Sequence, residues 1–155
     1  MLPFERLVRA VDGWARDNPS EEVFIQIGDT EYEPCHASFA RMMPMSEYRQ
    51  RLRCCDLFVA HAGMGSILQA LEDRKQMLML PRHQEWGEHT TDHQIHTAGR
   101  LGHLTGLMVV DTVEDLRREM STLLKLPMAG GDAISNQASP GLIAGVRDFL
   151  DGVRA

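Results

Sequence analysis

The sequence lacks several features that would place it in a specialised class of protein. It has three cysteines, an odd number with Cys54 and Cys55 adjacent, so it predicts no disulfide framework and fits a reducing cytoplasm. No apolar run approaches the ~20 residues needed to span a bilayer, and the first residues have neither the basic nor the apolar region of a signal peptide. The net charge of −6 argues against nonspecific binding to nucleic acid.

The remaining composition is typical of one globular domain spanning residues 1–155, with 43% hydrophobic and 25% charged residues. Hydrophobic periodicity alternates between the helical and the strand pattern along the chain. It predicts helices at 3–16, 45–54, 66–73, 91–100, 112–125 and 140–153, and strands at 23–27, 39–42, 57–60, 77–80 and 107–110. This alternation indicates an α/β fold, a Rossmann-like parallel sheet with helices on both faces.

The order of the predicted elements has one irregularity, because the chain opens with a helix. A doubly wound half normally begins with a strand, and the turn after that strand carries phosphate-binding glycines. In the usual strand order the missing strand would lie between 23–27 and 57–60. We therefore expect these two strands to have unpaired edges, and the chain alone to be poorly stable or prone to aggregation.

The first candidate binding loop follows the strand at 57–60 and reads HAGMGS. Gly63 and Gly65 would let a ligand approach the main chain closely. Ser66 is placed to cap the next helix, whose free N–H groups favour an anion. Two other interpretations stay open: a tight turn without a ligand, and a purely structural role for His61.

The second candidate loop follows the strand at 77–80. Arg82 could face an anionic group, and the segment after it concentrates hydrogen-bond donors and acceptors. Asp92 and Gln94 suit the hydroxyl groups of a sugar. Because ligands of open α/β sheets bind outside the carboxyl ends of the strands, the two loops predict one binding site built from two consecutive turns.

A metal site is the competing interpretation of the second loop. If the segment is helical, His89, His93 and His96 lie on one helix face and could hold zinc together with a carboxylate. Catalytic zinc motifs usually place a glutamate after the first histidine, whereas Glu88 precedes it here. We therefore predict no metal site and no cofactor.

Three stretches together resemble the C-terminal, nucleotide-sugar-binding domain of glycosyltransferase family 28. They are HAGMGS at 61–66, Pro81-Arg82, and GEHTTDHQ at 87–94. The likeness is strongest to stand-alone bacterial subunits of exopolysaccharide glycosyltransferases, which are related to the catalytic subunit of the eukaryotic two-subunit dolichol-linked N-acetylglucosaminyltransferase. It covers nearly the whole chain, and the combination of spaced motifs makes it specific.

The resemblance implies the donor-binding half of a GT-B fold that is split across two polypeptides. This chain would bind a UDP-sugar, from which an inverting, metal-independent hexosyltransferase moves the sugar to a lipid-linked or saccharide acceptor during polysaccharide biosynthesis. A membrane-associated partner subunit would carry the acceptor site, the general base and the only membrane contact, so the chain would be cytoplasmic, at the inner face of the membrane. The substrate-binding residues implied are His61, Gly63, Met64, Gly65, Ser66, Gln69, Arg82, Glu88, His89, Asp92, His93 and Gln94.

Two departures from the family pattern bear on function. Relatives begin with a strand that ends in a Gly-Thr turn, which this chain lacks, and many have a glutamate for the ribose diol where this chain has Gln69. An amide at that position loses a charge-assisted hydrogen bond. The missing strand favours the alternative of a noncatalytic nucleotide-sugar-binding or complex-assembly module, and a zinc hydrolase is the third possibility.

Overall fold

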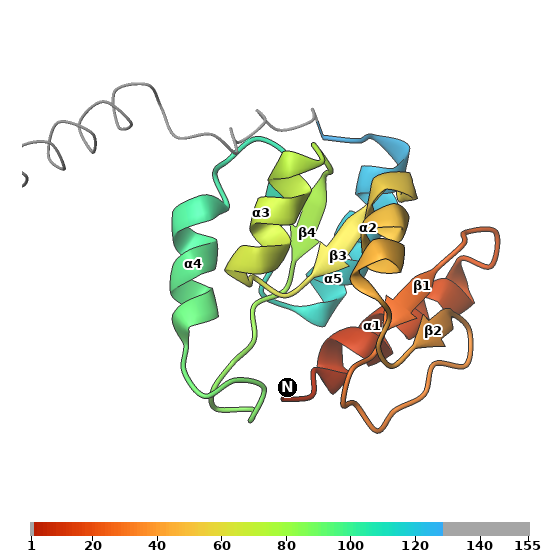
Figure 1. The fold of residues 1–155 in the computed structure, drawn as a ribbon, viewed down its shortest axis with the longest axis horizontal. Helices are drawn as coiled ribbons and strands as arrows, with labels where there is room; N and C mark the ends of the chain where they lie inside the picture. Colours follow the sequence, from red (N-terminus) through yellow and green to blue (C-terminus); the bar gives the residue numbers. More distant parts are fainter. Residues whose placement is uncertain (1, 129–155) are drawn as a thin grey trace, which may run out of the picture.

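The computed structural model describes residues 2–128. Helices and strands alternate along the chain as predicted (Figure 1). The elements are α1 (Glu5–Asp17), β1 (Phe24–Gln26), β2 (Ser38–Ala40), α2 (Met45–Cys54), β3 (Phe58–Ala60), α3 (Met64–Glu72), β4 (Met77–Met79), α4 (His93–Leu101), β5 (Leu107–Val109) and α5 (Val113–Lys125). The connection expected at 130–137 and the helix expected at 140–153 lie outside the described residues.

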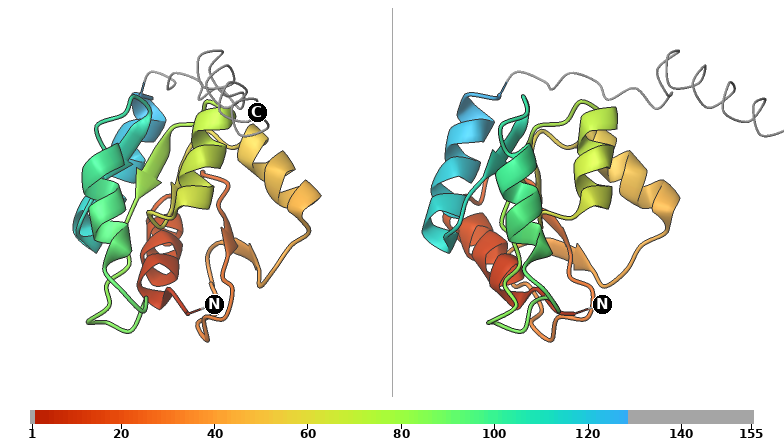
Figure 2. Two further views of the ribbon diagram at one scale, coloured as in Figure 1. Left: turned by 60° about the vertical axis from the view of Figure 1, so that its left-hand side comes forward. Right: turned by 90° about the vertical axis from the view of Figure 1, so that its left-hand side faces the viewer.

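The strands form a parallel layer between two layers of helices, with α1 and α5 on one face and α2 and α3 on the other (Figure 2). The alternation of side chains along β4 explains this arrangement. Leu78 and Leu80 pack with α1 and α5, whereas Met77 and Met79 pack with α3 and α4. Because β4 is covered on both faces, these four side chains are fully buried, which accounts for their continuous apolar run.

The parallel layer is interrupted where the missing strand was predicted. β1 pairs only with β2, and β3 pairs with β4, which in turn pairs with β5. β1 and β3 are thus both edge strands, although Ile25, Ile27 and Leu78 belong to one hydrophobic core under α1 and α5. The prediction that these two strands do not pair with each other is confirmed within residues 2–128.

Several boundaries differ from the sequence-based expectations. The helix expected from residue 66 begins at Met64 with Gly63 as its N-cap, so the prediction that Ser66 caps it was wrong. The helix expected from residue 91 begins at His93. For α5 the predicted cap is confirmed, because the Thr112 hydroxyl accepts the Asp115 N–H at 3.0 Å.

Two negative predictions about the chain can be compared with the described part. All three cysteines are free thiols, in agreement with the absence of a disulfide framework. None of the helices within residues 2–128 has the length and apolar character to cross a membrane.

A buried carboxylate of α1 fixes the loop between β1 and β2. Asp12 accepts hydrogen bonds from the Tyr32 hydroxyl at 2.6 Å and from the backbone N–H groups of Cys35, His36 and Ala37. Burial alone would raise the pKa of this carboxyl, but the four hydrogen bonds outweigh it and lower the pKa. The segment that leads into β2 is therefore fastened to α1.

Candidate functional site

The two predicted loops meet at the carboxyl ends of β3 and β4. The loop after β4 runs below α4 in Figure 1 and lies beside the first residues of the chain, and both views of Figure 2 agree with this placement. Direct contacts confirm it, since side chains of Arg6 and Arg82 bridge the two segments. The site therefore has three walls: the turn after β3, the loop after β4 and the start of α1.

His61 directly follows β3 and lies between the turn after this strand and Gln94. A Cβ atom at Gly63 would collide with the His61 ring, so glycine is needed there for the ring to lie over the turn. The Nδ1 atom is buried and has no hydrogen-bond partner within the described chain. Burial, and then the charge of Arg82, lower the pKa of His61 from 6.5 to about 4, while its contact with Gln94 opposes the shift. At neutral pH the ring is thus an uncharged group with an unused nitrogen.

Arg82 is the buried cation of the site, with 7% of its surface exposed. Its Nη1 donates to the backbone oxygens of Leu2 at 2.8 Å and Glu88 at 3.1 Å. Its backbone N–H donates to the Gln94 side-chain oxygen at 3.2 Å. The Nε atom is buried without a partner among residues 2–128. Burial lowers the pKa of Arg82 and Glu88 opposes this shift, but an arginine stays protonated in proteins.

Glu88, which was predicted to face the sugar or phosphates, is engaged in a different interaction. Its two oxygens accept from Nε and Nη2 of Arg6, each at 2.8 Å, and Oε2 also accepts the His83 N–H at 3.0 Å. Arg6 in turn donates to the Pro81 oxygen at 2.8 Å. A bidentate, largely buried ion pair of this kind fixes the relative position of the two side chains. The Arg6–Glu88 pair therefore joins the loop after β4 to α1, and we call it the clamp.

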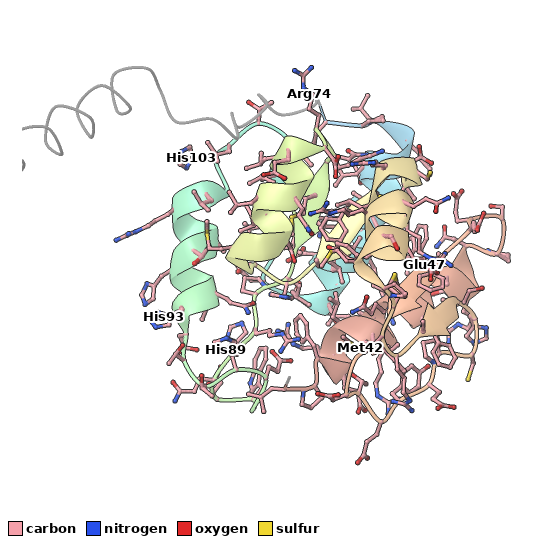
Figure 3. The ribbon with its side chains drawn as sticks, viewed as in Figure 1. Met42, Glu47, Arg74, His89, His93 and His103 are labelled. Atoms are coloured by element: carbon pink, nitrogen blue, oxygen red, sulfur yellow. The ribbon has the colours of Figure 1, made fainter. Side chains whose placement is uncertain are left out.

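The histidines of the second loop do not form the helix face that the zinc alternative requires. His89 precedes α4, and its Nδ1 lies 2.9 Å from the Thr91 oxygen. Figure 3 shows His89 and His93 at the lower end of α4, where His93 is exposed. Within residues 2–128, no three His, Cys, Asp or Glu side chains converge on a point suited to a metal ion.

Two of the predicted residues on α3, Ser66 and Gln69, face α2 rather than the His61–Arg82–Gln94 cluster. Ser66 interacts with the Tyr48 hydroxyl of α2, and the Gln69 side-chain nitrogen lies 4.0 Å from the Met45 sulfur. Met64 is exposed, as is Asp92, whose carboxylate accepts the Gln84 N–H at 3.0 Å. Gln94, in contrast, is buried and contacts both His61 and Arg82.

One residue that holds the site together was not predicted from the sequence, and neither was an indole next to it. Arg6, which pairs with Glu88, lies on an ordinary amphipathic helix, where nothing in the pattern marks it. Trp86 lies outside the His61–Arg82–Gln94 cluster, with its ring centre 4.4 Å from the Arg6 guanidinium. Trp86 could have been noticed, because an indole beside a glycine in a polar loop has no core to join.

Taken together, the groups at this edge have the chemistry of an anion site. Two helices begin here, α3 after its N-cap Gly63 and α4 after its N-cap Asp92. In neither helix does the side chain of the N-cap residue accept a hydrogen bond from the first turn. Helix N-termini carry partial positive charge and free N–H groups. With the buried Arg82 and the neutral His61 between them, the site can bind a multiply charged anion such as a diphosphate.

Comparisons with known proteins identify the family and the fold. The family model of the glycosyltransferase family 28 C-terminal domain matches residues 2–138. A comparison with curated proteins found no match. The fold is similar to that in "Crystal Structure Analysis of the Glycotransferase of kitacinnamycin", with a TM-score of 0.57 at 20% sequence identity. The likeness covers 78% of this chain and 31% of that one, so the chain spans about a third of that neighbour.

Proposed function

Because the chain belongs to glycosyltransferase family 28 and corresponds to its C-terminal domain, we propose that it binds the nucleotide-sugar donor of a glycosyl transfer reaction. The fold is the Rossmann-like half of a GT-B glycosyltransferase. In the proposal the donor is a UDP-sugar and the reaction is hexosyl transfer to a lipid-linked or saccharide acceptor. The acceptor site and the general base lie in a membrane-associated partner subunit, which also brings this chain to the inner face of the membrane.

The observation that supports this function most is the pair of unpartnered atoms between two helix N-termini. Arg82 Nε and His61 Nδ1 are both buried and both lack a hydrogen-bond partner among residues 2–128. Buried polar groups are normally satisfied, so a ligand is the natural partner. A diphosphate could accept from Arg82 and from the first N–H groups of α3 and α4. It would then be held without a metal ion, and the leaving UDP would be stabilised by preorganised donors.

Arg82→Met is expected to weaken UDP binding by about 10- to 150-fold, the equivalent of ~1.5–3 kcal/mol for a hydrogen bond to a charged group. UMP, which lacks the second phosphate, should lose less. The measurement is isothermal titration calorimetry with UDP, UMP and UDP-glucose on the same protein preparation. Arg82→Lys keeps the charge but loses the planar set of donors. Its UDP affinity should lie between those of the unmodified protein and Arg82→Met.

The exposed Arg100 of α4 supplies the matched control, and Arg100→Met should leave all three affinities unchanged. Unaltered UDP affinity in a folded Arg82→Met protein would remove Arg82 from the phosphate site. Absence of any UDP binding by the unmodified chain at millimolar ligand would overturn the proposed function. Binding without turnover in the presence of the partner subunit would instead favour the noncatalytic module, which the unpaired edges of β1 and β3 also suggest.

The affinity for UDP-glucose is expected to rise as the pH falls from 7 to 5. In the free protein the pKa of His61 is about 4, so the ring is neutral over this range. A diphosphate next to His61 offsets the charge of Arg82 and raises the pKa of the ring. At a pH between the His61 pKa values of the free and the bound protein, ligand binding is therefore accompanied by uptake of a proton. Each unit by which the bound ligand raises the pKa of His61 strengthens binding at low pH by up to about tenfold.

Titrations in buffers of different ionisation enthalpy measure this proton uptake directly. UDP-glucose is the suitable ligand because it has no terminal phosphate that titrates near pH 6. His61→Asn keeps a polar group without a titrating ring, so its affinity should not vary with pH. A flat profile in the unmodified protein would show that the diphosphate does not lie against His61.

A further inference from the structure

The loop after β4 holds an exposed tryptophan in a fixed position. Glu88 at the end of this loop is clamped to Arg6 of α1. The turn is closed by hydrogen bonds from Gly87 N–H to the Gln84 oxygen at 2.9 Å and from Glu88 N–H to the His83 oxygen at 3.1 Å. Gly87 has φ +68°, a backbone conformation that favours glycine. The loop is thus a rigid turn that carries the indole of Trp86.

Contacts on the indole hold it without burying it. The Arg6 guanidinium lies 4.4 Å from the centre of the Trp86 ring, and the His83 ring centre lies 4.1 Å away. Even so, 52% of Trp86 remains exposed. The second tryptophan of the chain, Trp14, is 4% exposed and packs in the core. A large apolar ring that is held in place and left open to solvent is typical of a contact surface.

Trp86 forms one wall of a hollow between the loop and the start of α1. The hollow has a volume of about 310 Å³ and is lined by Pro3, Glu5, Arg6, Trp86, Gly87 and Glu88. Its volume is at the lower end of the range for small-ligand sites. Arg82 Nη1 donates to the backbone oxygen of Glu88, so Glu88 contacts both the hollow and the candidate anion site.

The lining determines which ligand chemistry fits. Pro3 and the indole of Trp86 present apolar surface. The Glu5 side chain is 40% exposed, and its Oε1 accepts from Arg9 Nε at 2.7 Å. A carboxylate has further acceptor positions, so Glu5 can also accept a hydrogen bond from a ligand hydroxyl. The charge of Arg6 is already met by Glu88, so the hollow has no free cation for a phosphate group. Apolar surface beside a carboxylate acceptor suits a pyranose ring, whose C–H groups pack on an aromatic ring while its hydroxyls donate to carboxylate oxygens.

We propose that this hollow is a second saccharide subsite, which holds a sugar unit of the acceptor next to the donor. The inference rests on the proposed function and adds that the donor domain itself contacts the acceptor. Trp86 is the specificity-determining residue of this subsite, and the clamp between Arg6 and Glu88 keeps it in position. The remainder of the acceptor would lie in the partner subunit.

Acrylamide quenching of tryptophan fluorescence tests the subsite, because Trp14 is buried and Trp86 is the accessible fluorophore. The probes are cellobiose, maltose and di-N-acetylchitobiose at millimolar concentration. At least one should lower the quenching constant saturably, by about half, as a sugar covers the indole. UDP should have little effect, and Trp86→Phe reports the contribution of Trp14.

Saturation-transfer NMR with the same disaccharides provides the variant test. Trp86→Ala should abolish the saccharide signal, Trp86→Phe should keep part of it, and UDP affinity should change less than about twofold in both. No protection by any disaccharide would overturn the subsite, as would protection by oligolysine in place of sugars. An equal loss of UDP affinity in Trp86→Ala would place Trp86 in the donor site instead. If the disaccharides bind but UDP does not, the proposed function fails while the saccharide site itself remains.

Discussion

Gly65→Val is expected to lower the affinity for UDP by at least about a hundredfold while the protein stays folded. Gly65 lies in the first turn of α3, where the proposed diphosphate would meet the helix N-terminus. A Cβ built on Gly65 has no atom within 4 Å, so the added side chain enters open space at the site and disturbs no packing. Because valine has a higher helix propensity than glycine, stability should be equal or slightly greater.

Gly99 of α4 offers a matched control for this substitution. It is also a helical glycine whose Cβ would enter open space, but it lies near the other end of its helix, away from the two candidate loops. Gly99→Val should therefore leave UDP affinity unchanged. Calorimetry gives the two affinities and thermal unfolding gives the stabilities. Equal UDP affinity in the folded Gly65→Val and Gly99→Val proteins would mean that α3 does not bind the phosphates.

Glu88→Gln is expected to reduce the free energy of unfolding by about 3 kcal/mol, because it leaves a largely buried Arg6 without its counter-charge. The Glu88 side chain is 8% exposed and that of Arg6 is 20% exposed. The loss is large beside the total stability of about 5–15 kcal/mol that is usual for a domain. Urea denaturation followed by circular dichroism measures the difference.

The exposed pair Glu47–Arg51 on α2 is the control, and Glu47→Gln should reduce stability by less than about 1 kcal/mol. Replacing both partners, in Arg6→Met with Glu88→Met, should recover part of the loss because no unpaired buried charge remains. If Glu88→Gln proved no more destabilising than Glu47→Gln, the pair would not be the clamp that joins the loop to α1.

The sequence was sufficient to predict most of the secondary structure of residues 2–128 and the edge of the sheet at which the two candidate loops meet. Within residues 2–128, periodicity located the helices and strands to within a few residues, since it reports directly which face of an element is buried. The difference that bears on the candidate site was at the start of α3. The sequence predicts Ser66 as the cap because serine is a good cap residue, whereas Gly63 takes that position and lets the His61 ring lie over the turn.

For the pairing of strands, too, the sequence predicted one part of the arrangement and not another. The order of elements predicted that 23–27 and 57–60 would not pair with each other, since the usual strand order leaves a place between them. The structure agrees, with β1 and β3 at the edges of separate sheets. The sequence did not reveal that one core continues across this break, because packing between α1, α5 and both sheets depends on contacts between distant residues.

What the sequence by itself determined was local: the alternation of elements, the parallel sheet, and the two polar loops at its carboxyl edge. The roles of the charged residues in those loops were decided by tertiary structure alone. Glu88 reads as a candidate sugar ligand, yet it pairs with Arg6, 82 residues away, and only then is Trp86 held open beside the site. A charged side chain takes the partner that compensates its loss of water, and folding rather than sequence proximity determines which partner is near.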